Sequence, residues 1–421
     1  TEEELHRQQL KGLQWTVSHA YHGSKAYRHK LEQAGVKPEA IRSLDDLKRL
    51  PFTTAEDLKE GYPFPRLSVP VQEVVRVHAS SGTTGKRKVL CYTRKDLRDW
   101  AHFFARCYEM AGLNVKDRVQ IAVGYGVWTA GAGFQAGCEE FGAMAVPVGP
   151  GNLEMQTQFL MDFQSTVLCC TASMGLLLAE EVDRAGIRDK INLKKMIFGS
   201  ERSSRAMRRK IREILGMEHL FDIPGLTELY GPGTGLDCIH HTGIHYWADY
   251  YILEIVDPET LEPVPPGETG EMVVTTLTKE GVPLIRYRTR DLSRLIPGRC
   301  PCGSILPRHD QILGRTDDMI IFRAVNIYPG QLDAVLSDVD RIGSEFQIIL
   351  ERSQGLDSML VRVERELGLD SECDPELARI IAGKIKSRLL VTPEVELVDY
   401  GALVRSTRKT KRVIDRREEE S

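Results

Sequence analysis

Four short apolar runs, separated by longer helical patterns, constrain the fold of this chain more than any other feature of its sequence. They cover residues 118–123, 143–148, 166–170 and 195–198. Short apolar runs of this kind are typical of strands, and strands that alternate with helices build layered α/β structures around a parallel sheet. From about residue 70 to residue 225 we therefore expect an α/β architecture with a mainly parallel sheet.

The sequence before and after this segment follows other patterns. Residues 1–62 are predicted to be helical, with helix starts at Ser43 and at Thr53, which has capping-box spacing to Glu56. Strand-like runs at 250–256 and 270–276 are separated by turn-rich sequence, which predicts a β-rich subdomain over about 235–312.

The last hundred residues are predicted to form a compact α+β unit. We expect its strands near 345–351, 358–364 and 394–399, and a helix near 374–389. The fold class that follows is α/β, with a large multi-layer N-terminal domain over 1–316 and a small, mobile α+β C-terminal domain over 317–421.

Charge and hydropathy exclude several classes of partner. The formal net charge is −4 and no block of the chain carries one sign, which argues against nucleic acid as the main partner. No stretch approaches the roughly eighteen apolar residues that a membrane span needs. The acidic opening is unlike a signal peptide. We therefore expect a cytoplasmic protein that does not contact membranes, in which most of the nine cysteines are core residues.

The segment from Ser80 to Lys88 combines hydroxyls, two glycines and three cations in nine residues. Small residues let backbone N–H groups approach a phosphate closely, and the hydroxyls and cations add donors and charge. Two residues lie between the glycines where a Walker A loop has four, so this is not that motif. The alternative is a surface turn rich in Ser, Thr and Gly.

A second glycine-rich segment, residues 124–133, lacks the spacing of a dinucleotide-binding loop. Its aromatic residues suggest an apolar pocket, with packing in the core as the alternative. The candidates for a pocket wall that accepts an aromatic acid are Tyr125, Trp128 and Phe134, and Ala132 leaves room beside them.

With the Ser80–Gly85 loop, four further segments occur in an order that resembles the adenylate-forming (AMP-binding) superfamily, and more closely its phenylacetate–CoA ligase and coenzyme F390 synthetase branch. They are Gly199-Ser200-Glu201, Gly225-Leu226-Thr227-Glu228, Tyr287-Arg288-Thr289-Arg290-Asp291 and Gly314-Arg315-Thr316-Asp317-Asp318. The basic segment Arg405–Arg412 near the C-terminus completes the resemblance, which covers nearly the whole chain.

The resemblance implies a role for each motif. Lys409 is the catalytic lysine, with Lys411 as the alternative. Glu228 helps to hold Mg²⁺, Thr227 contacts phosphate, and Asp317 is the pivot of a hinge. The implied ATP- and AMP-binding residues are Ser80, Ser81, Gly82, Thr83, Thr84, Gly85, Gly199, Ser200, Glu201, Asp222, Ile223, Thr227, Asp291 and Arg315. For each charged residue, a structural ion pair is the alternative.

The chain departs from the family pattern at four positions. Ala324 stands where a glycine beside the thiol tunnel is usual, and Pro224 stands where an aromatic residue usually packs near the adenine. Arg87 replaces a frequent proline, and Arg408 replaces the usual glycine before the lysine. These departures leave adenylation intact as the expected first half-reaction and bear mainly on thioester formation.

Cys300 and Cys302 form a tight pair after a turn, and two thiolates at this spacing can bind one tetrahedral Zn²⁺. Cys238 and His245 are the best candidates for the other two ligands, because the branch has a corresponding Cys…Gly-x-His pattern. Three cysteines and one histidine would make the zinc structural. A redox pair and an incidental pair are the alternatives.

The function implied by the resemblance is activation of an aromatic carboxylic acid by ATP and Mg²⁺, with transfer of the acyl group to coenzyme A. Two other hypotheses are an adenylyltransferase that does not use coenzyme A, similar to F390 synthetase, and a non-catalytic nucleotide-binding protein. The expected partners are the acid, ATP and coenzyme A. Dimers are common in this branch, so a homodimer is an open alternative.

Overall fold

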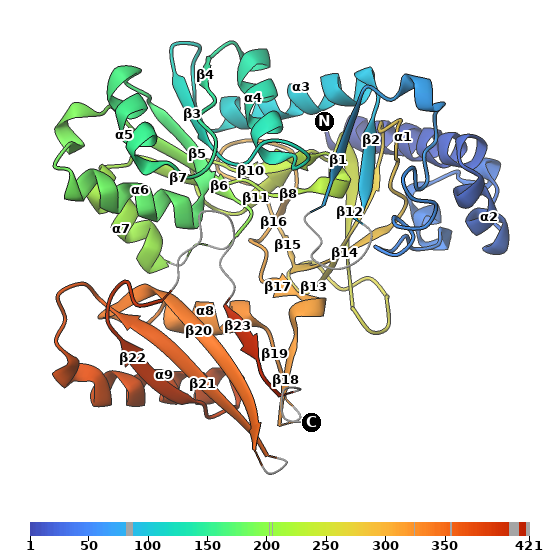
Figure 1. The fold of residues 1–421 in the computed structure, drawn as a ribbon. Helices are drawn as coiled ribbons and strands as arrows, with labels where there is room; N and C mark the ends of the chain where they lie inside the picture. Colours follow the sequence, from blue (N-terminus) through green and yellow to red (C-terminus); the bar gives the residue numbers. More distant parts are fainter. Residues whose placement is uncertain are drawn as a thin grey trace.

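The computed structural model describes residues 1–80, 87–201, 203, 205–323, 325–353, 356–403 and 412–417 (Figure 1). The α-helices in this part of the chain are α1 (Glu2–Gly23), α2 (Lys25–Gln33), α3 (Arg94–Met110), α4 (Ala130–Phe141), α5 (Leu153–Asp162), α6 (Ala172–Arg184), α7 (Arg205–Leu215), α8 (Pro329–Leu336) and α9 (Asp374–Leu389). Its short 3₁₀ helices include η2 (Leu44–Arg49), η5 (Thr227–Leu229) and η6 (Thr316–Asp318).

A five-stranded parallel sheet forms the centre of the larger part of the molecule. Its order is β4-β3-β5-β6-β7. The strands are β3 (Arg118–Ala122), β4 (Met144–Val146), β5 (Val167–Thr171), β6 (Lys195–Gly199) and β7 (His219–Asp222). The four apolar runs of the sequence supply four of these strands, so the expectation of a parallel sheet is confirmed.

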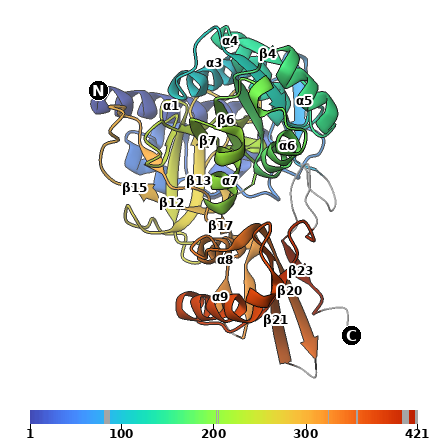
Figure 2. The same ribbon diagram turned by 90° about the vertical axis from the view of Figure 1, so that its left-hand side faces the viewer.

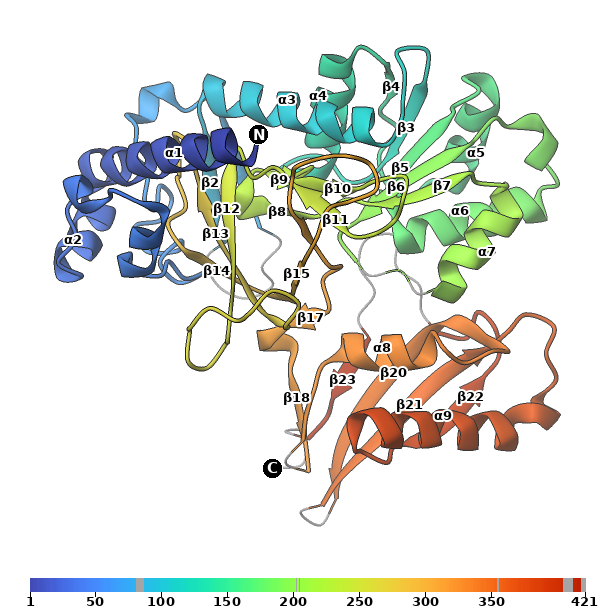
Figure 3. The same cartoon turned by 180° about the vertical axis from the view of Figure 1, so that it is seen from behind.

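Helices cover both faces of this sheet (Figures 1 and 3). Alternate residues of β5 belong to different cores. Val167 and Cys169 pack into the core that includes α3 and α4, whereas Leu168 and Cys170 pack into the core that includes α6 and α7. Because side chains alternate across a strand, a strand buried on both faces must be apolar throughout. This explains why the runs are continuous rather than alternating.

Antiparallel strands build the β-rich region that was predicted over about 235–312. One sheet has the order β12-β13-β14-β17, with β12 (Tyr251–Val256), β13 (Gly270–Thr276), β14 (Tyr287–Ser293) and β17 (Gly314–Arg315). Another has the order β10-β11-β16-β15, with β10 (Gly235–Asp237), β11 (Ile244–Tyr246), β15 (Leu295–Ile296) and β16 (Arg308–His309). Two smaller antiparallel pairs precede this region in the chain. They are β1 (Arg76–Ala79) with β2 (Val89–Tyr92), and β8 (Gly225–Leu226) with β9 (Gly231–Pro232).

The C-terminal part forms a second body below the larger one (Figure 2). Its sheet has the order β22-β21-β20-β23, with β20 (Ile342–Ser353), β21 (Leu356–Arg365), β22 (Glu394–Val398) and β23 (Val413–Asp415). A hairpin of β18 (Ile320–Phe322) and β19 (Val325–Ile327) precedes it. Its buried core runs from Ile320 to Leu397 and is separate from the others. The predicted α/β class with an α+β C-terminal domain is confirmed.

The helix predicted to start at Thr53 is wrong. Residues 55–63 form turns, whereas the start at Ser43 is followed by η2. Thr53 is fully buried, and its hydroxyl donates to the carbonyl of Ile285 at 2.6 Å. Its backbone forms a bridge with Tyr287 of β14. Contacts with the β-rich region therefore take the residue that a helix would have used as its cap.

Candidate active site

A pocket opens at the carboxyl ends of the parallel strands. Cys170 is the last residue but one of β5, Gly199 ends β6, and Ile223 follows β7. Ligands of open parallel sheets bind at this edge. The lining consists of Val123, Trp128, Thr129, Ala130, Phe134, Cys170, Gly199, Ser200, Ile223, Gly225, Thr227 and Pro232.

Two predicted sets of residues meet in this one pocket. The residues expected to bind the nucleotide contribute Gly199, Ser200, Ile223 and Thr227. The residues expected to bind the acid contribute Trp128 and Phe134. Attack of a carboxylate on a nucleotide phosphate requires this proximity.

Two predicted acid-pocket residues do not line the pocket. Tyr125 is 37 % exposed, and its ring covers Gly131, where an added methyl group would lie 2.6 Å from the ring. Ala132 lies on α4 outside the lining. The lining also includes Val123, Thr129, Ala130, Cys170, Gly225 and Pro232, which were not among the predicted site residues. The predicted strand ends could have pointed to Val123 and Cys170.

Two carboxylates predicted to bind ATP or AMP contact other protein groups. Glu201 accepts a hydrogen bond of 2.6 Å from the backbone N–H of Ser173, in the first turn of α6. Asp222 accepts from the side chain of Gln311 at 2.5 Å and forms an ion pair with Arg208. Both lie beside the pocket rather than in its lining, so any contact with adenine would come from their neighbours Ser200 and Ile223.

Glu228 lies on η5, beside the pocket, and is 6 % exposed. Its carboxylate accepts a hydrogen bond of 2.9 Å from the hydroxyl of Tyr287 and forms an ion pair with Lys88. Burial acts to raise the pKa of Glu228, but the adjacent Lys88 outweighs it, so the pKa is lowered. The carboxylate is therefore ionised at neutral pH and available to a cation.

Two buried side chains donate hydrogen bonds to the main chain around Glu228. The hydroxyl of Tyr92 donates to the carbonyls of Thr227 and Tyr230, at 3.0 and 2.9 Å. The amino group of Lys279 donates to the carbonyl of Glu228 at 2.6 Å. Burial lowers the pKa of Lys279 to about 8, against the charges of Asp96 and Glu228, which act to raise it.

Asp291 and Arg315 pair where β14 meets β17. The guanidinium of Arg315 donates to Asp291 at 2.8 Å and to Asp317 on η6 at 2.8 and 2.9 Å. Burial raises the pKa of Asp291 to about 6, although Arg315 acts to lower it. One guanidinium thus links the predicted ribose-binding carboxylate to the predicted pivot.

Polar side chains connect the C-terminal part to α6 and α7. The hydroxyl of Tyr400 hydrogen-bonds with Glu180 and with Lys210, and Glu180 and Lys210 also pair at 2.9 Å. A second link joins Arg205 to Asp338 at 3.3 Å. At these positions, hydrogen bonds and ion pairs form the contact between the C-terminal part and helices α6 and α7.

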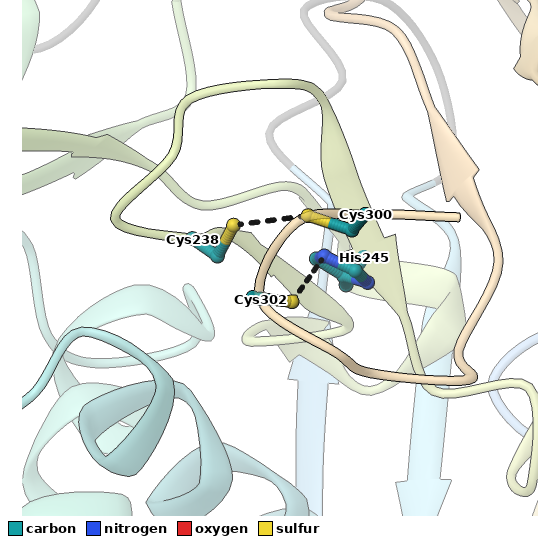
Figure 4. A group of neighbouring side chains, drawn as sticks. All are labelled: Cys238, His245, Cys300 and Cys302. Carbon is teal, nitrogen blue, oxygen red and sulfur yellow. Dashed lines mark hydrogen bonds between the residues drawn. The ribbon is translucent and has the colours of Figure 1, made fainter. Parts of the chain in front are cut away.

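Four metal-binding side chains from separate segments come together, as the sequence predicted. The ligand atoms of Cys238, His245, Cys300 and Cys302 all lie within 4.8 Å of one another (Figure 4). The Nδ1 atom of His245 lies 3.1 Å from the carbonyl of Leu306, so it can donate there and leave Nε2 to face the thiols. Such an outer hydrogen bond is usual for a metal-binding histidine.

Several predicted site residues lie outside the described part of the chain. They are Ser81, Gly82, Thr83, Thr84, Gly85, Ala324, Arg408, Lys409 and Lys411. Ser80 and Lys88, on either side of the glycine-rich loop, are described, and the N–H of Ser80 donates to the carbonyl of Lys88 at 3.0 Å. Among the described helices, none is both long enough and apolar enough to span a membrane.

Comparison with protein families gives two matches. The AMP-binding enzyme family matches residues 18–278, and the AMP-binding enzyme C-terminal domain matches residues 324–417. The phenylacetate-coenzyme A ligase of Escherichia coli (strain K12) is 41% identical over 99% of this chain and 95% of its own length. That of Thermus thermophilus is 40% identical over 99% of this chain and 98% of its own length.

Solved structures of 2-hydroxyisobutyryl-CoA ligase resemble this fold in two different states. The postadenylation state with 2-HIB-AMP has a TM-score of 0.91 at 29% identity, covering 99% of this chain and 90% of that one. The thioesterification state with 2-HIB-AMP and CoA has a TM-score of 0.73 at 30% identity, covering 99% and 91%. The arrangement of the present chain is therefore closer to the postadenylation state of that ligase.

Proposed function

The chain belongs to the AMP-binding enzyme family and is an AMP-forming acid–CoA ligase, and from this we propose that its acid is phenylacetate or a closely related aryl acid. The similar ligases of Escherichia coli and Thermus thermophilus are named for phenylacetate. Of the described residues that line the pocket, none is charged, and Trp128, Phe134 and Val123 give it an apolar side. Such a wall favours an acid whose only charge is the reacting carboxylate.

The observation that carries this proposal is the meeting of the predicted acid and nucleotide residues in one pocket. In the first half-reaction, an oxygen of the acid carboxylate attacks the α-phosphorus of ATP, and the bond to pyrophosphate breaks. In the second, the thiol of coenzyme A attacks the acyl carbonyl, loses its proton and displaces AMP. Trp128 and Phe134 would orient the acid toward the nucleotide on the side of Gly199 and Ile223.

The residues around Glu228 fit a magnesium ion. An ionised, buried carboxylate is a hard oxygen ligand of the kind Mg²⁺ prefers. Lys88 and Tyr287 both contact Oε1 of Glu228, so Mg²⁺ would bind the other carboxylate oxygen or take the place of the ammonium group. When bound with ATP, the ion would offset the charge that builds up on the phosphates. Thr227 would contact those phosphates, Asp291 would accept hydrogen bonds from the ribose hydroxyls, and Lys409 remains the predicted catalytic lysine.

A pyrophosphate-release assay tests this proposal. Phenylacetate, benzoate and 2-hydroxyisobutyrate would each be supplied with ATP and Mg²⁺, with and without coenzyme A. We expect release with phenylacetate to exceed release with 2-hydroxyisobutyrate by about 100-fold or more, because a pocket with apolar, aromatic walls binds a small hydroxy acid poorly. Thioester should accumulate only with coenzyme A. Release without thioester would favour an adenylyltransferase instead.

We also propose that Cys238, His245, Cys300 and Cys302 bind one structural zinc ion. Three thiols and one imidazole suit a closed tetrahedral site, and the preset orientation of His245 supports it. Elemental analysis should give about one zinc per chain, and Cys302→Ser should lower both the zinc content and the melting temperature. A metal-free protein with an unchanged melting temperature would contradict this proposal.

The boundary at 316/317, with Asp317 as the pivot, is proposed as well. The separate core from Ile320 to Leu397 supports it, as do the polar links through Arg205 and Tyr400. Solution scattering with and without coenzyme A and the adenylate would test whether the C-terminal part changes its position.

A further inference from the structure

The turn that carries Glu228 is strained. Tyr230 ends η5 with a φ of 100°, in a region that side-chain-bearing residues rarely adopt, and it is 1 % exposed. A backbone of this kind persists only when its surroundings hold it in place. The backbone carbonyls of this turn also need hydrogen-bond donors, because they lie in a buried region and not inside a regular helix.

Two side chains supply those donors. Tyr92 serves the carbonyls of Thr227 and Tyr230, and Lys279 serves the carbonyl of Glu228, which lies between them. Both Tyr92 and Lys279 are fully buried. The amino group of Lys279 also lies 4.9 Å from the centres of the rings of Tyr92 and Tyr230, whose faces favour a cation.

The segment that carries Lys279 is itself anchored. The backbone N–H groups of Glu280 and Gly281 donate to the carboxylate of Asp96 at 2.7 and 2.9 Å. Asp96 lies in the first turn of α3 and is fully buried. A buried lysine is costly, because its charge leaves water. Lys279 supplies a hydrogen-bond donor to the main chain of Glu228, which an apolar side chain at this position could not do.

We infer that Lys279 is a positioning residue that, together with Tyr92, fixes the main chain of residues 227–230 so that the carboxylate of Glu228 faces the metal bound to ATP. This inference rests on the proposed function. Neither side chain touches the carboxylate through these bonds: they act through the backbone, while Tyr287 and Lys88 hold the carboxylate itself.

The test measures metal-dependent nucleotide binding without turnover. Calorimetric titration with α,β-methylene-ATP, with and without Mg²⁺, would compare the wild type with Lys279→Met and Tyr92→Phe. Lys279→Met removes the donor and the charge at similar size, and Tyr92→Phe removes only the hydroxyl. We expect Mg²⁺-dependent binding to weaken about tenfold in Lys279→Met and less in Tyr92→Phe, since loss of an outer partner typically costs 10–100-fold in metal affinity. Binding without metal should change less than about twofold.

Lys195→Met is the matched control, because Lys195 also donates to a carbonyl, that of Gly112 at 2.5 Å, away from this turn. Thermal unfolding identifies variants that do not fold. A weakened Mg²⁺ effect in either folded variant, with Lys195→Met unchanged, supports the inference. A Mg²⁺ effect equal to that of the wild type in both folded variants overturns it. Absence of acid-dependent pyrophosphate release in the wild type would instead refute the proposed function.

Discussion

The turn under the pocket and the contact between the two parts of the chain are built in opposite ways. In the turn, Tyr92 and Lys279 are fully buried and Glu228 is 6 % exposed. In the contact, the side chain of Arg205 is 82% exposed and that of its partner Asp338 is 33% exposed. The first is fixed by desolvated hydrogen bonds, and the second is joined by polar groups that water can reach.

This difference fits a two-step reaction. Exposed ion pairs contribute little stability, so a contact made of them can open and re-form at small cost. A buried network that loses one member leaves a polar group unpaired, which costs much more. We therefore expect the turn to stay the same in both half-reactions, and the contact to hold the C-terminal part only in the arrangement that resembles the postadenylation state.

The largest effect should come from Glu228→Gln, in the fixed region. The substitution keeps the size of the side chain and removes the charge proposed to hold Mg²⁺. We expect kcat/KM for pyrophosphate release to fall roughly 100-fold. Glu268→Gln, at an exposed position, is the control and should retain full activity. Activity of Glu228→Gln within threefold of the wild type would remove Glu228 from the metal site.

Asp291 should give the next largest effect, and it should depend on pH. Its pKa is raised to about 6, so the carboxylate proposed to accept hydrogen bonds from the ribose becomes protonated below that pH. The KM for ATP should rise about tenfold between pH 7 and pH 5. Asp291→Asn should raise the KM at all pH values and remove this dependence. A wild-type KM for ATP that does not change with pH would contradict the assignment.

The raised pKa of Asp291 affects the stability of the nucleotide-free protein in the opposite direction: a rise in pH favours ATP binding but lowers stability. In the unfolded chain this carboxyl ionises near its ordinary value of 3.8, whereas in the folded protein it keeps its proton up to about pH 6. Between these values the folded state binds more protons, so its contribution to the free energy of unfolding decreases as the pH rises.

A smaller effect, confined to the first half-reaction, is expected from Tyr400→Phe. The hydroxyl that joins Glu180 and Lys210 is lost, so the C-terminal part is held less firmly against α6 and α7. Adenylation should slow about two- to fivefold, while transfer from preformed adenylate to coenzyme A should not slow. Tyr21→Phe is the matched control, since Tyr21 also donates to a glutamate, Glu32, at 2.8 Å but far from the contact. Equal slowing of both steps would show that Tyr400 does not act on the domain arrangement.

Arg205→Ala should have the smallest effect. The pair with Asp338 is largely exposed, so we expect less than a twofold change in either half-reaction, and this change should disappear in 0.5 M salt. Arg362→Ala is the control, because it removes another exposed ion pair, with Glu396, inside the C-terminal part. A fivefold or larger loss in Arg205→Ala alone would mean that the contact is not as easily broken as its exposure implies.

The predictable features of this fold are those with a strong local pattern. Four of the five strands of the parallel sheet follow from continuous apolar runs, whereas β7 (His219–Asp222) was not predicted. The helix predicted near 374–389 is α9 (Asp374–Leu389). Cys300 and Cys302 could be chosen because the Cys-x-Cys spacing is a chemical signature, whereas Cys238 and His245 were chosen from the resemblance to the phenylacetate–CoA ligase branch. Thr53 was misassigned because a bridge to Tyr287, more than two hundred residues away, outweighed its local capping pattern.

Other parts of the site leave no mark in the sequence. Lys279 looks like an ordinary surface lysine until the fold places it beneath Glu228. Tyr125 was expected in the acid pocket because its residue type suits one, but a type does not state a direction, and its ring lies over Gly131. Cys170 and Ala130 line the pocket because Cys170 lies next to the carboxyl end of β5 and α4 begins at Ala130.

The guanidinium of Arg315 donates to Asp291 and to Asp317 at once. A ribose bound at Asp291 therefore competes for the same group that steadies the segment before the C-terminal body. By thermodynamic reciprocity, if occupancy by the nucleotide biases the orientation of that body, the orientation must alter nucleotide affinity by the same factor. The arrangement that admits coenzyme A would then also determine how tightly AMP is retained, which links the order of product release to a single arginine.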